Sequence, residues 1–564
     1  MKRLILVCEK VDSAELKRLC MALTAYFSRD GRPALKVSVA DAACLAESKA
    51  LLQRAVDGNA ITVGSEEGVL LAAESVSLLW IAAQQLLKDG LLPDGVAEGE
   101  TVIPLTRCRA KHWGLPIPAY TAGEIKPRLY NCGAGKCEDD EPSVMQVVTD
   151  TTETAFLYYV EQLKQMGYVV VFENGIDGNR YANFFDALGN NFYAYYMCEM
   201  GASVGVTRVI WDRNSTPLSQ FCYHVEGKGS SKLYYFHHVC YGGHIALIHC
   251  ADNSWIFIDG ENVAPDSPID PDGKYADEIY GFMRENSGLQ EGERVVISCW
   301  CVSHLDCDHF RGFWSLIKKH HDGIELQRTM FNAPSREVAH HQCWMTEFKS
   351  CMDLVNSYYP DLMHLKTHPG QEVQIANIHF TVLHSQDAVG EFWTDKRETF
   401  CEVWNGWWPL YRVDKKNPTN LYYRSNAKKY DFNNSSTVYR IDIEGLSLLE
   451  MGDAFRADAW VVPYYALKTL TTDTVVLAHH FFNDELHPFY WSLIRQERQW
   501  YALVTAPDYP FAGEKLDMVN ACDPAKNQYL FTAKYEATQV LSKVDGMVVM
   551  EEIPAPSDSP RAPR

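Results

Sequence analysis

The stretch Val295-Val-Ile-Ser-Cys-Trp-Cys-Val-Ser-His304-Leu-Asp306-Cys-Asp308-His309 passes from an apolar segment directly into four side chains that can bind a metal. The apolar part predicts a buried β-strand over 294–302, followed by a helix over 310–318. Alternation in extended backbone would turn the first His and both Asp to one side, and the last His would face the same point from the start of the helix. Two imidazoles and two carboxylates this close are poorly tolerated without a cation, so the turn predicts a metal site.

A plainer interpretation of the same turn is a polar loop in which Asp308 caps the following helix. The side chain of Cys307 alternates away from its neighbours, so we expect it to be buried and not to bind metal. Stretches further along the chain favour the metal site over the plain loop, because they match the remaining parts of one family's site in the proper order.

The pattern His-x-Asp-x-Asp-His at 304–309 resembles the strand-end motif His-x-His-x-Asp-His of the metallo-β-lactamase superfamily, with Asp306 in place of the second His. The variant is similar to that of the soluble metal-hydrolase domain of competence-type DNA-uptake proteins. Three further stretches extend the resemblance over about residues 233–510: Gly243–Gly260, with the strand-end Asp259; Asn433–Asp453, with the Asn-Asn-Ser and Gly-Asp motifs; and Val475–His480, which ends in a His pair.

Two motifs depart from the family pattern. Phe481-Phe482 stand where the family has Gly-Ser after the His pair, and Leu503-Val-Thr-Ala only approximates its late Ser-Val-Gly stretch. We therefore expect loops around the substrate that differ from those of the family.

The resemblance implies an αββα sandwich with two divalent metal ions, zinc or manganese. One ion would bind His304, Asp306 and one His of the pair His479 and His480, and the other would bind Asp308 and His309, with Asp453 between them. Asp308 would also orient the attacking water as the catalytic residue. The residues that would support the ligands from behind are Asp259, Asn434 and Ser435. Because carboxylates prefer harder ions than imidazoles do, Asp306 shifts the expectation from strict zinc toward manganese or a mixed preference.

The predicted activity is metal-dependent hydrolysis, with a phosphodiester as the favoured substrate, because a two-metal site suits phosphoryl transfer. Hydrolysis of a lactone, thioester or amide is the alternative within the same fold, which cannot separate these reactions. Di-iron reduction of oxygen or nitric oxide is a further enzymatic alternative, although the 54 residues after Pro510 are too few for the flavodoxin domain that usually accompanies it. A non-catalytic metal-stabilised binding module is the alternative outside enzymes.

The composition of the chain indicates which kinds of partner and which compartment to expect. With 52 Lys and Arg against 73 Asp and Glu, the formal charge is −21, which disfavours extended nucleic acid and favours a small phosphoester substrate. The 17 Cys are scattered without compact spacing, and the N-terminal apolar run is too short for a signal peptide, so we expect a cytoplasmic protein with reduced thiols. The apolar stretch Val69–Leu87 is interrupted by polar residues and predicts a buried helix, so no membrane association is expected. Protein partners cannot be predicted.

The expected fold class is α/β. Its expected divisions are a small α/β domain over 1–110, a linker over 111–148, an aromatic-rich α+β module over 149–228, the metallo-β-lactamase-like domain over 229–512, a strand and helix extension over 513–550 and a disordered tail over 551–564. In the module, Asp150 is expected to cap a helix that Gly167 ends, and the aromatic run Phe192–Tyr196 favours strand packing over a binding surface.

Several other candidates have plainer interpretations. Cys132 and Cys137 lie alone in the expected linker, which makes a zinc role improbable. His384 follows a predicted strand and matches a middle His ligand of the family, but an exposed loop His is the favoured interpretation. Three His pairs lie outside the motif positions and are expected at the surface or beside the substrate: 237–238, 320–321 and 340–341.

Overall fold

The computed structural model divides into two compact units, residues 1–130 with 143–213 and residues 131–142 with 214–564. From residue 143 onward it describes the chain apart from 214, 240–242, 333–342, 390–391, 394–398, 401–410, 415–416, 424–431, 455–456, 483, 506–510, 533–535 and 562–564. Before residue 143 it describes 2–8, 16, 19–20, 23–24, 35–55, 59–73, 79, 82–83, 86, 91–92, 96–104, 113, 115–125 and 129–131. The expected mixed α/β class is confirmed.

Five strands near the N-terminus form a mixed sheet in the order β2-β1-β4-β3-β5. Their bounds are β1 Lys2–Val7, β2 Leu35–Val39, β3 Asn59–Ser65, β4 Gly68–Ala73 and β5 Gly99–Pro104, and helix α2 covers Ala42–Arg54. The helix expected over 69–87 is wrong at its start, because β4 pairs antiparallel with β3 and parallel with β1. A short, continuously apolar run does not distinguish a buried strand from a helix, and here strand pairing decides.

A second sheet of this unit is antiparallel and runs β8-β12-β11-β10-β9, with β6 also beside β8. The bounds are β6 Glu124–Ile125, β7 Leu129–Asn131, β8 Ser143–Thr151, α4 Glu153–Gln165, β9 Val169–Ile176, β10 Asn179–Phe185, β11 Asn191–Met197 and β12 Gly205–Asp212. Helix α4 packs Phe156 and Leu163 into a core that includes Phe192. The aromatic run of β11 is therefore buried, as the favoured interpretation predicted. Thr152, not Asp150, caps α4, since its Oγ1 accepts the N–H of Ala155.

Much of the described part of the expected linker belongs to this core, which corrects that expectation. Trp113, Ile117 and Tyr120 are at most 1% exposed and pack with the residues of α4. The indole N–H of Trp113 donates to the carbonyl of Ile117 at 2.9 Å. The sequence of this segment has no strand or helix periodicity, so its burial could not be predicted from the pattern of apolar residues. Cys132 and Cys137 lie outside the described residues.

The second unit contains two large mixed sheets. The first has the order β20-β19-β17-β16-β15-β14-β32-β33, with β18 beside β17, and the second has the order β13-β21-β22-β27-β28-β29-β30-β31. The bounds are β13 Tyr223–His224, β14 Lys232–Tyr235, β15 Ile245–His249, β16 Trp255–Asp259, β17 Val295–Cys301, β18 Ile324–Leu326, β19 Arg328–Met330, β20 Met363–Leu365, β21 Glu372–Ala376, β22 Ile378–His384, β27 Val438–Ile443, β28 Leu446–Glu450, β29 Thr474–Val476, β30 Trp500–Val504, β31 Gln528–Thr532, β32 Ala537–Val544 and β33 Met547–Pro554. Short strands β23 Phe392–Trp393, β24 Thr399–Phe400, β25 Tyr411–Asp414 and β26 Asn417–Tyr423 are also described.

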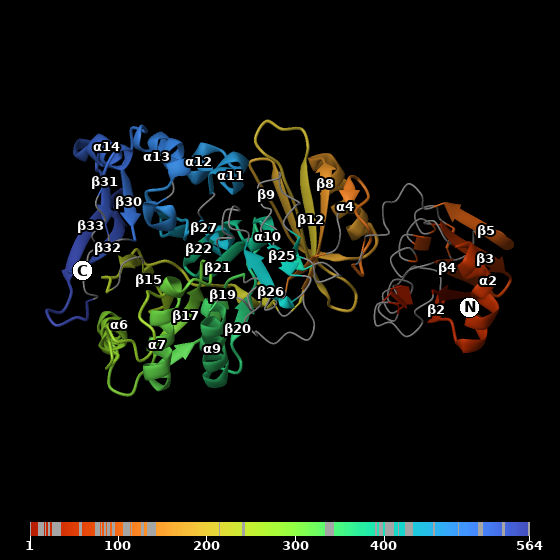
Figure 1. The fold of residues 1–564 in the computed structure, drawn as a ribbon, viewed down its shortest axis with the longest axis horizontal. Coiled ribbons are helices and arrows are strands. Elements are labelled where there is room, and N and C mark those ends of the chain that lie inside the picture. The colour runs from red at the N-terminus through yellow and green to blue at the C-terminus, as the bar shows by residue number, and fades with distance from the viewer. Residues whose placement is uncertain are drawn as a thin grey trace. The chain divides into compact units, whose positions relative to one another are not determined.

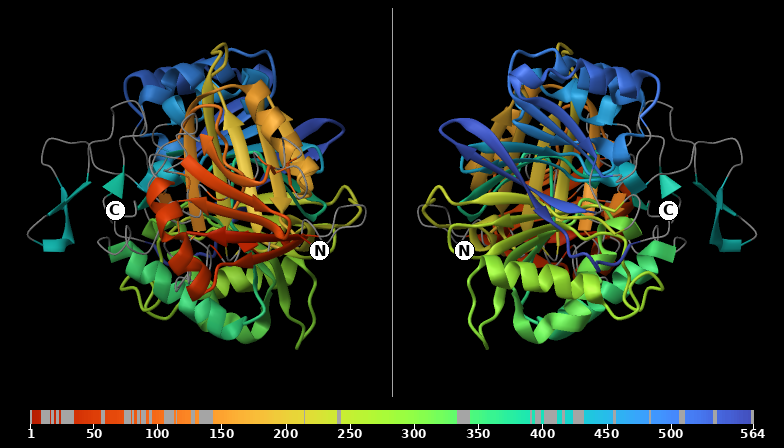
Figure 2. Two further views of the ribbon diagram at one scale, coloured as in Figure 1. Left: turned by 90° about the vertical axis from the view of Figure 1, so that its right-hand side faces the viewer. Right: turned by 90° about the vertical axis from the view of Figure 1, so that its left-hand side faces the viewer.

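Helices lie on both sides of the strands of this unit (Figure 1). On one side are α6 Lys274–Asn286, α7 Arg311–His320 and α9 Cys343–Tyr358, and on the other are α11 Ala457–Trp460, α12 Leu467–Leu470, α13 His487–Ile494 and α14 Glu514–Ala521. Helices α6, α7 and α9 bury apolar side chains against Phe257, Ile297 and Trp300 of the first sheet. Figure 2 shows the strands and the two groups of helices from two opposite sides, each perpendicular to the view of Figure 1.

The C-terminal region is part of both sheets, which corrects two expectations. The strand and helix extension expected over 513–550 supplies β31 to one sheet and β32 to the other. The tail expected to be disordered from 551 continues β33 to Pro554 and then buries Ser559, whose hydroxyl donates to Glu278 at 2.7 Å. Polar composition favoured disorder, but strand pairing and this buried hydrogen bond order the segment.

Among the residues that the structure describes, no helix has both the length and the apolar character needed to cross a membrane.

Candidate metal centre

The candidate ligands come from loops at the C-terminal ends of strands in both sheets. Strand β17 ends at Cys301, just before His304, and a 3-10 turn over Cys307–His309 then precedes α7. His309 therefore lies in this turn and not in the helix where it was expected. Strand β28 leads to Asp453, and the parallel strand β29 leads to a 3-10 turn η6, Ala478–Phe481, that carries the His pair. The two sheets thus bring distant parts of the chain to one place.

Four side chains form a compact group, and their ligand atoms all lie within 4.8 Å of one another: Asp308, His309, Asp453 and His480. The Nε2 of His480 is 3.1 Å from Asp453 Oδ2 and 3.4 Å from Asp308 Oδ2. The Nε2 of His309 is 3.4 Å from Asp453 Oδ2 and 3.9 Å from Asp308 Oδ2. The Asp453 carboxylate is therefore shared by both imidazoles.

A divalent cation fits this group. Ligands placed tetrahedrally at about 2.1 Å from an ion lie about 3.4 Å from one another, and the four His–Asp separations run from 3.1 to 3.9 Å. The Nε2 of His309 is buried and makes no hydrogen bond with the described residues. A buried ring nitrogen without a hydrogen bond is costly, and a bound cation would remove that cost.

His304 and Asp306 lie at the rim of the group. The Nε2 of His304 is 3.8 Å from Asp306 Oδ2 and 4.0 Å from Asp453 Oδ2, and it too is buried without a hydrogen bond to the described chain. The side chain of Asp306 is 24% exposed, whereas that of His304 is fully buried. His304 and Asp306 therefore border the four-residue group without belonging to it.

The structure distinguishes the two members of the His pair. His480 points into the group, whereas half-buried His479 does not belong to it and packs its ring against Phe482. The expected pairing of this His with His304 and Asp306 is wrong, because His480 contacts Asp308 and Asp453. Both His residues have left-handed backbone, with φ of 50° and 53°, and this turn of the chain aims the second ring inward.

Gly452 places Asp453 by a close approach. Its φ is +49°, and a Cβ at this position would lie 2.8 Å from the Cβ of Ser303. The N–H of Asp453 donates to Ser436 Oγ at 3.0 Å, and the N–H of Thr437 donates to Ser303 O at 2.7 Å. The chain before Asp453 is thus packed directly against the residue that precedes His304.

Asp259, which the resemblance gave as a supporting residue, contacts the candidate ligand His309. Its Oδ2 lies 2.6 Å from His309 Nδ1, which leaves Nε2 to face the group. The same carboxylate accepts the N–H and the hydroxyl of Ser303 at 2.6 and 2.7 Å. A carboxylate that holds the far nitrogen of a His ligand fixes its ring orientation and raises its basicity. On His480, the hydroxyl of Thr505 contacts Nδ1 in the same role.

Without a cation, the charges of the group are balanced by protons. Burial lowers the pKa of His480, but Asp453 and Asp308 outweigh it and raise the pKa to about 9. Burial also opposes a charge on His309, yet Asp453 and Asp259 raise its pKa well above the ordinary value. For Asp453 burial acts to raise the pKa, and the two imidazoles bring it well below the usual range. The group therefore attracts positive charge strongly.

His304 differs from the other two imidazoles. Burial, and then the nearby His309, lower the pKa of His304 to about 4. Its ring is therefore neutral at pH 7, which is the form that binds a metal.

Other expected supporting residues have mixed outcomes. Ser435 is buried, as is its neighbour Ser436, and it is Ser436 that holds the N–H of Asp453. The side chain of Asn434 lies outside the described residues. Cys307 is only half-buried, so the expectation of burial is wrong in part.

The remaining His candidates lie outside the group. His384 is buried and not exposed as expected, with 1% of its surface accessible. His237 and His238 are also buried, and they contact Glu278 and Glu261 respectively. The side chains of His320 and His321 are 19% and 27% exposed. His340 and His341 lie outside the described residues.

Sequence reasoning missed a buried pair behind the group, His244 and Glu450, whose side chains are 3.2 Å apart. It also missed Ser303 and Thr505. Each of the four lies within three residues of a candidate ligand or at the end of a strand in a motif stretch. Sequence periodicity describes one helix or strand at a time, so it cannot predict that residues of two different sheets will meet.

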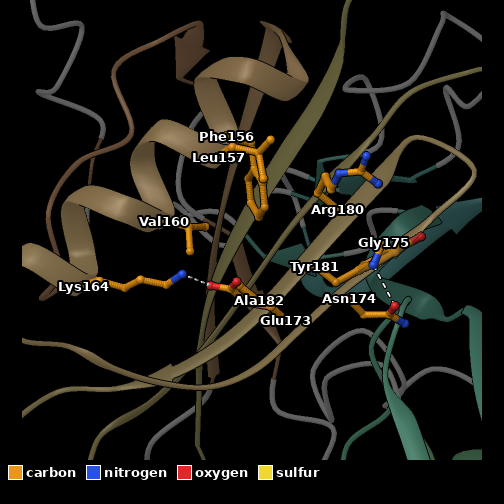
Figure 3. Close-up of a pocket in the computed structure, with 10 residues that line it drawn as sticks. All are labelled: Phe156, Leu157, Val160, Lys164, Glu173, Asn174, Gly175, Arg180, Tyr181 and Ala182. Carbon is orange, nitrogen blue, oxygen red and sulfur yellow. Dashed lines mark hydrogen bonds and ion pairs between the residues drawn. The ribbon is translucent and has the colours of Figure 1, made fainter.

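A separate pocket of 390 Å³ lies between α4 and the strands β9 and β10 (Figure 3). It is lined by Phe156, Leu157, Val160, Lys164, Glu173, Asn174, Gly175, Arg180, Tyr181 and Ala182. Its charged side chains are already paired, Lys164 with Glu173 and Arg180 with Glu153. The pocket therefore presents no free charge that would select a substrate.

No protein-family model and no curated protein matches this chain. The assignment of a function therefore depends on the geometry of the site itself.

Proposed function

We propose that this protein is a metal-dependent hydrolase in which residues 229–512 form an αββα sandwich of the metallo-β-lactamase type. The observation that carries the proposal is the convergence of Asp308, His309, Asp453 and His480 from separate strand ends to within 4.8 Å. The two sheets with helices outside them support the architecture. A polar loop with a helix-capping Asp308 would not bring the distant Asp453 and His480 to it.

Imidazole nitrogens and carboxylate oxygens together suit zinc or manganese. Asp308, His309 and His480 would hold one ion, and His304 and Asp306 the second, with Asp453 shared between them. Such ions lower the pKa of a water molecule toward neutrality and stabilise negative charge on an attacked phosphoryl or carbonyl oxygen.

Two carboxylates define the open side of the site. The side chains of Asp306 and Asp308 are 24% and 20% exposed, whereas those of His304, His309, Asp453 and His480 are at most 6% exposed. Substrate and water would enter from this side. Burial raises the pKa of Asp308, but His309 and His480 outweigh it and the net pKa lies below the ordinary value. Asp308 is thus ionised at neutral pH and would orient the attacking water by accepting its proton.

A small phosphodiester is the proposed substrate. Two adjacent cation sites match the charge that develops on both oxygens of an in-line displacement at phosphorus. The net charge of −21 would repel a long polyanion more than a nucleotide or another small phosphoester. We place the protein in the cytoplasm because its scattered Cys fit a reducing compartment.

The test combines metal analysis with turnover. The purified full chain, loaded with zinc or with manganese, is expected to hydrolyse a chromogenic phosphodiester, and His304→Ala or Asp308→Ala should lower the rate at least about 100-fold while the fold remains intact. Circular dichroism and elemental analysis of each variant separate loss of fold from loss of metal. Asp442→Asn, an exposed acid on β27, serves as control. Full activity in either variant, or a parent chain without bound metal, contradicts the proposal.

The same panel includes a lactone, a thioester and an amide. Faster hydrolysis of one of these than of the phosphodiester would leave the metal site in place and change the substrate class. Bound metal without turnover of any substrate would instead favour the metal-stabilised binding module.

A further inference from the structure

His244 and Glu450 form a buried pair directly behind the candidate ligands. The Nε2 of His244 lies 3.2 Å from Glu450 Oε2, and both side chains are fully buried. His244 stands just before β15 of one sheet, and Glu450 ends β28 of the other. Neither residue belongs to the proposed ligand set, so the pair joins the two sheets without binding the ions.

The main chain of His244 is attached to one half of the site. Its N–H donates to the carbonyl of Asp308 at 3.1 Å. Its carbonyl accepts the N–H groups of Gly260 and Glu261, which follow Asp259, at 2.9 and 2.8 Å. A shift of His244 would therefore move both the turn that carries Asp308 and the segment that orients His309.

Glu450 is attached to the other half. Its second oxygen, Oε1, accepts the N–H of Gly452 at 3.0 Å. Gly452 is held between Ser303 and Ser436, where even a Cβ would not fit, so it transmits the position of Glu450 to Asp453. Both oxygens of this carboxylate thus link the Asp453 turn to His244.

The ring of His244 is itself fixed. Its Nδ1 lies 3.1 Å from the hydroxyl of Tyr235, and its Nε2 is also 3.9 Å from Asp259 Oδ2. The ring therefore borders the carboxylate that holds His309 while it contacts Glu450.

We infer that His244 and Glu450 are positioning residues that set the separation between the Asp308–His309 turn and Asp453, and thereby the affinity of the site for metal. This inference depends on the proposed metal site. The effect passes through the contact of Glu450 with His244 and through the hydrogen bond from Gly452, so a side chain of the same shape without the charge should preserve it.

The chain offers a matched control in a second buried His–Glu pair. The Nε2 of His237 lies 3.0 Å from Glu278 Oε2, and the two side chains are 3% and 7% exposed. His237 also contacts Thr538 and Ser559, and its partner helix α6 supplies none of the candidate ligands. Loss of Glu278 should therefore cost stability without changing the metal site.

The experiment measures the affinity of the full chain for Mn²⁺ and for Zn²⁺ by titration calorimetry, with circular dichroism to check the fold. Glu450→Leu is expected to weaken binding at least about ten-fold. Glu450→Gln should remain within about 1.5-fold of the parent, and Glu278→Leu should match the parent. Tyr235→Phe, which loses only the hydroxyl beside His244, should weaken binding about three-fold and decides the question if Glu450→Leu does not fold.

The inference is overturned if Glu450→Leu, or Tyr235→Phe in its place, binds metal as tightly as the parent. It is also overturned if Glu450→Gln binds as weakly as Glu450→Leu, since charge and not position would then be responsible, or if Glu278→Leu weakens binding equally. A parent chain that binds no metal would instead refute the proposed function on which the inference depends.

Discussion

His309 and His480 hold positive charge where a metal would bind, while His304 does not. The carboxylates raise the pKa of His480 to about 9 against the effect of burial, and they also raise that of His309 well above its ordinary value. Burial keeps the pKa of His304 at about 4. At pH 7 the ring of His304 is therefore neutral, whereas those of His309 and His480 are protonated. A metal must displace a proton from His309 and from His480, but not from His304.

Metal binding should accordingly release protons. At pH 7 His309 and His480 are protonated without metal and must be neutral as ligands, so about two protons should leave per filled site. Because both pKa values are raised, affinity should increase from pH 6 to pH 9. Titration calorimetry in buffers of different ionisation enthalpy measures the release.

His480→Gln provides the control for this measurement, and it should release about one proton fewer than the parent. Binding without any proton release at pH 7 would contradict the charge distribution described for the group.

At the residue scale, the motif with the shortest spacing was the most predictable part of the site. His304, Asp306, Asp308 and His309 stand within six residues, and local spacing alone predicts that they lie near one another. The structure places Asp308 and His309 in the group and His304 and Asp306 at its rim. Choosing between His479 and His480 was not possible from the sequence. That choice depends on left-handed backbone at 479–481, and no residue there is a glycine that would have indicated it.

At the scale of elements, the turn between β28 and Asp453 is tightly constrained at Gly452. Gly452 has φ +49° and lies against Ser303. Gly288, at the end of α6, has a similar φ of +63° but open space around it. The two glycines therefore separate the cost of left-handed backbone from the cost of a close approach.

Gly452→Ala should lower the free energy of unfolding by about 3 kcal/mol, from backbone strain together with a clash at Ser303. Gly288→Ala should cost roughly 1 kcal/mol, because strain acts alone. Urea unfolding followed by tryptophan fluorescence measures both. Equal losses in the two variants would mean that the contact with Ser303 has no energetic role.

Strands that carry alternating or continuous apolar runs were predicted well, and the segments between them were not. The strand predicted over 294–302 is β17, Val295–Cys301. The run at 69–73 became a strand where a helix was predicted, because its apolar residues have no period and pairing with β1 and β3 decides. Residues 113–120 entered a core without forming a regular element.

At the scale of the whole molecule, the C-terminal segment supplies the last two strands at one edge of the first sheet of the second unit. Strand β32 pairs with β14, and β33 pairs with β32. Beyond them Ser559 donates to Glu278, and Lys274 contacts Asp558. The segment therefore helps to cover the buried His237–Glu278 pair far along the chain.

Deletion of residues 555–564 should lower the free energy of unfolding by about 1–3 kcal/mol, because Glu278 and His237 lose a buried hydrogen-bond partner. Metal affinity should stay within about two-fold of the parent, since the segment contacts no candidate ligand. Deletion of 562–564 alone is the control. Unchanged stability after the longer deletion would mean that Ser559 contributes nothing.

The residues themselves marked the turn at 304–309, because local spacing governs which side chains share a face. The family resemblance marked Asp259 and Asp453 as candidates at strand ends. The three-dimensional packing of two sheets selected His480, brought it to Asp308 and placed Glu450 against His244. Those contacts join residues up to about two hundred positions apart, and such distances depend on how whole sheets pack and not on any periodicity along the chain.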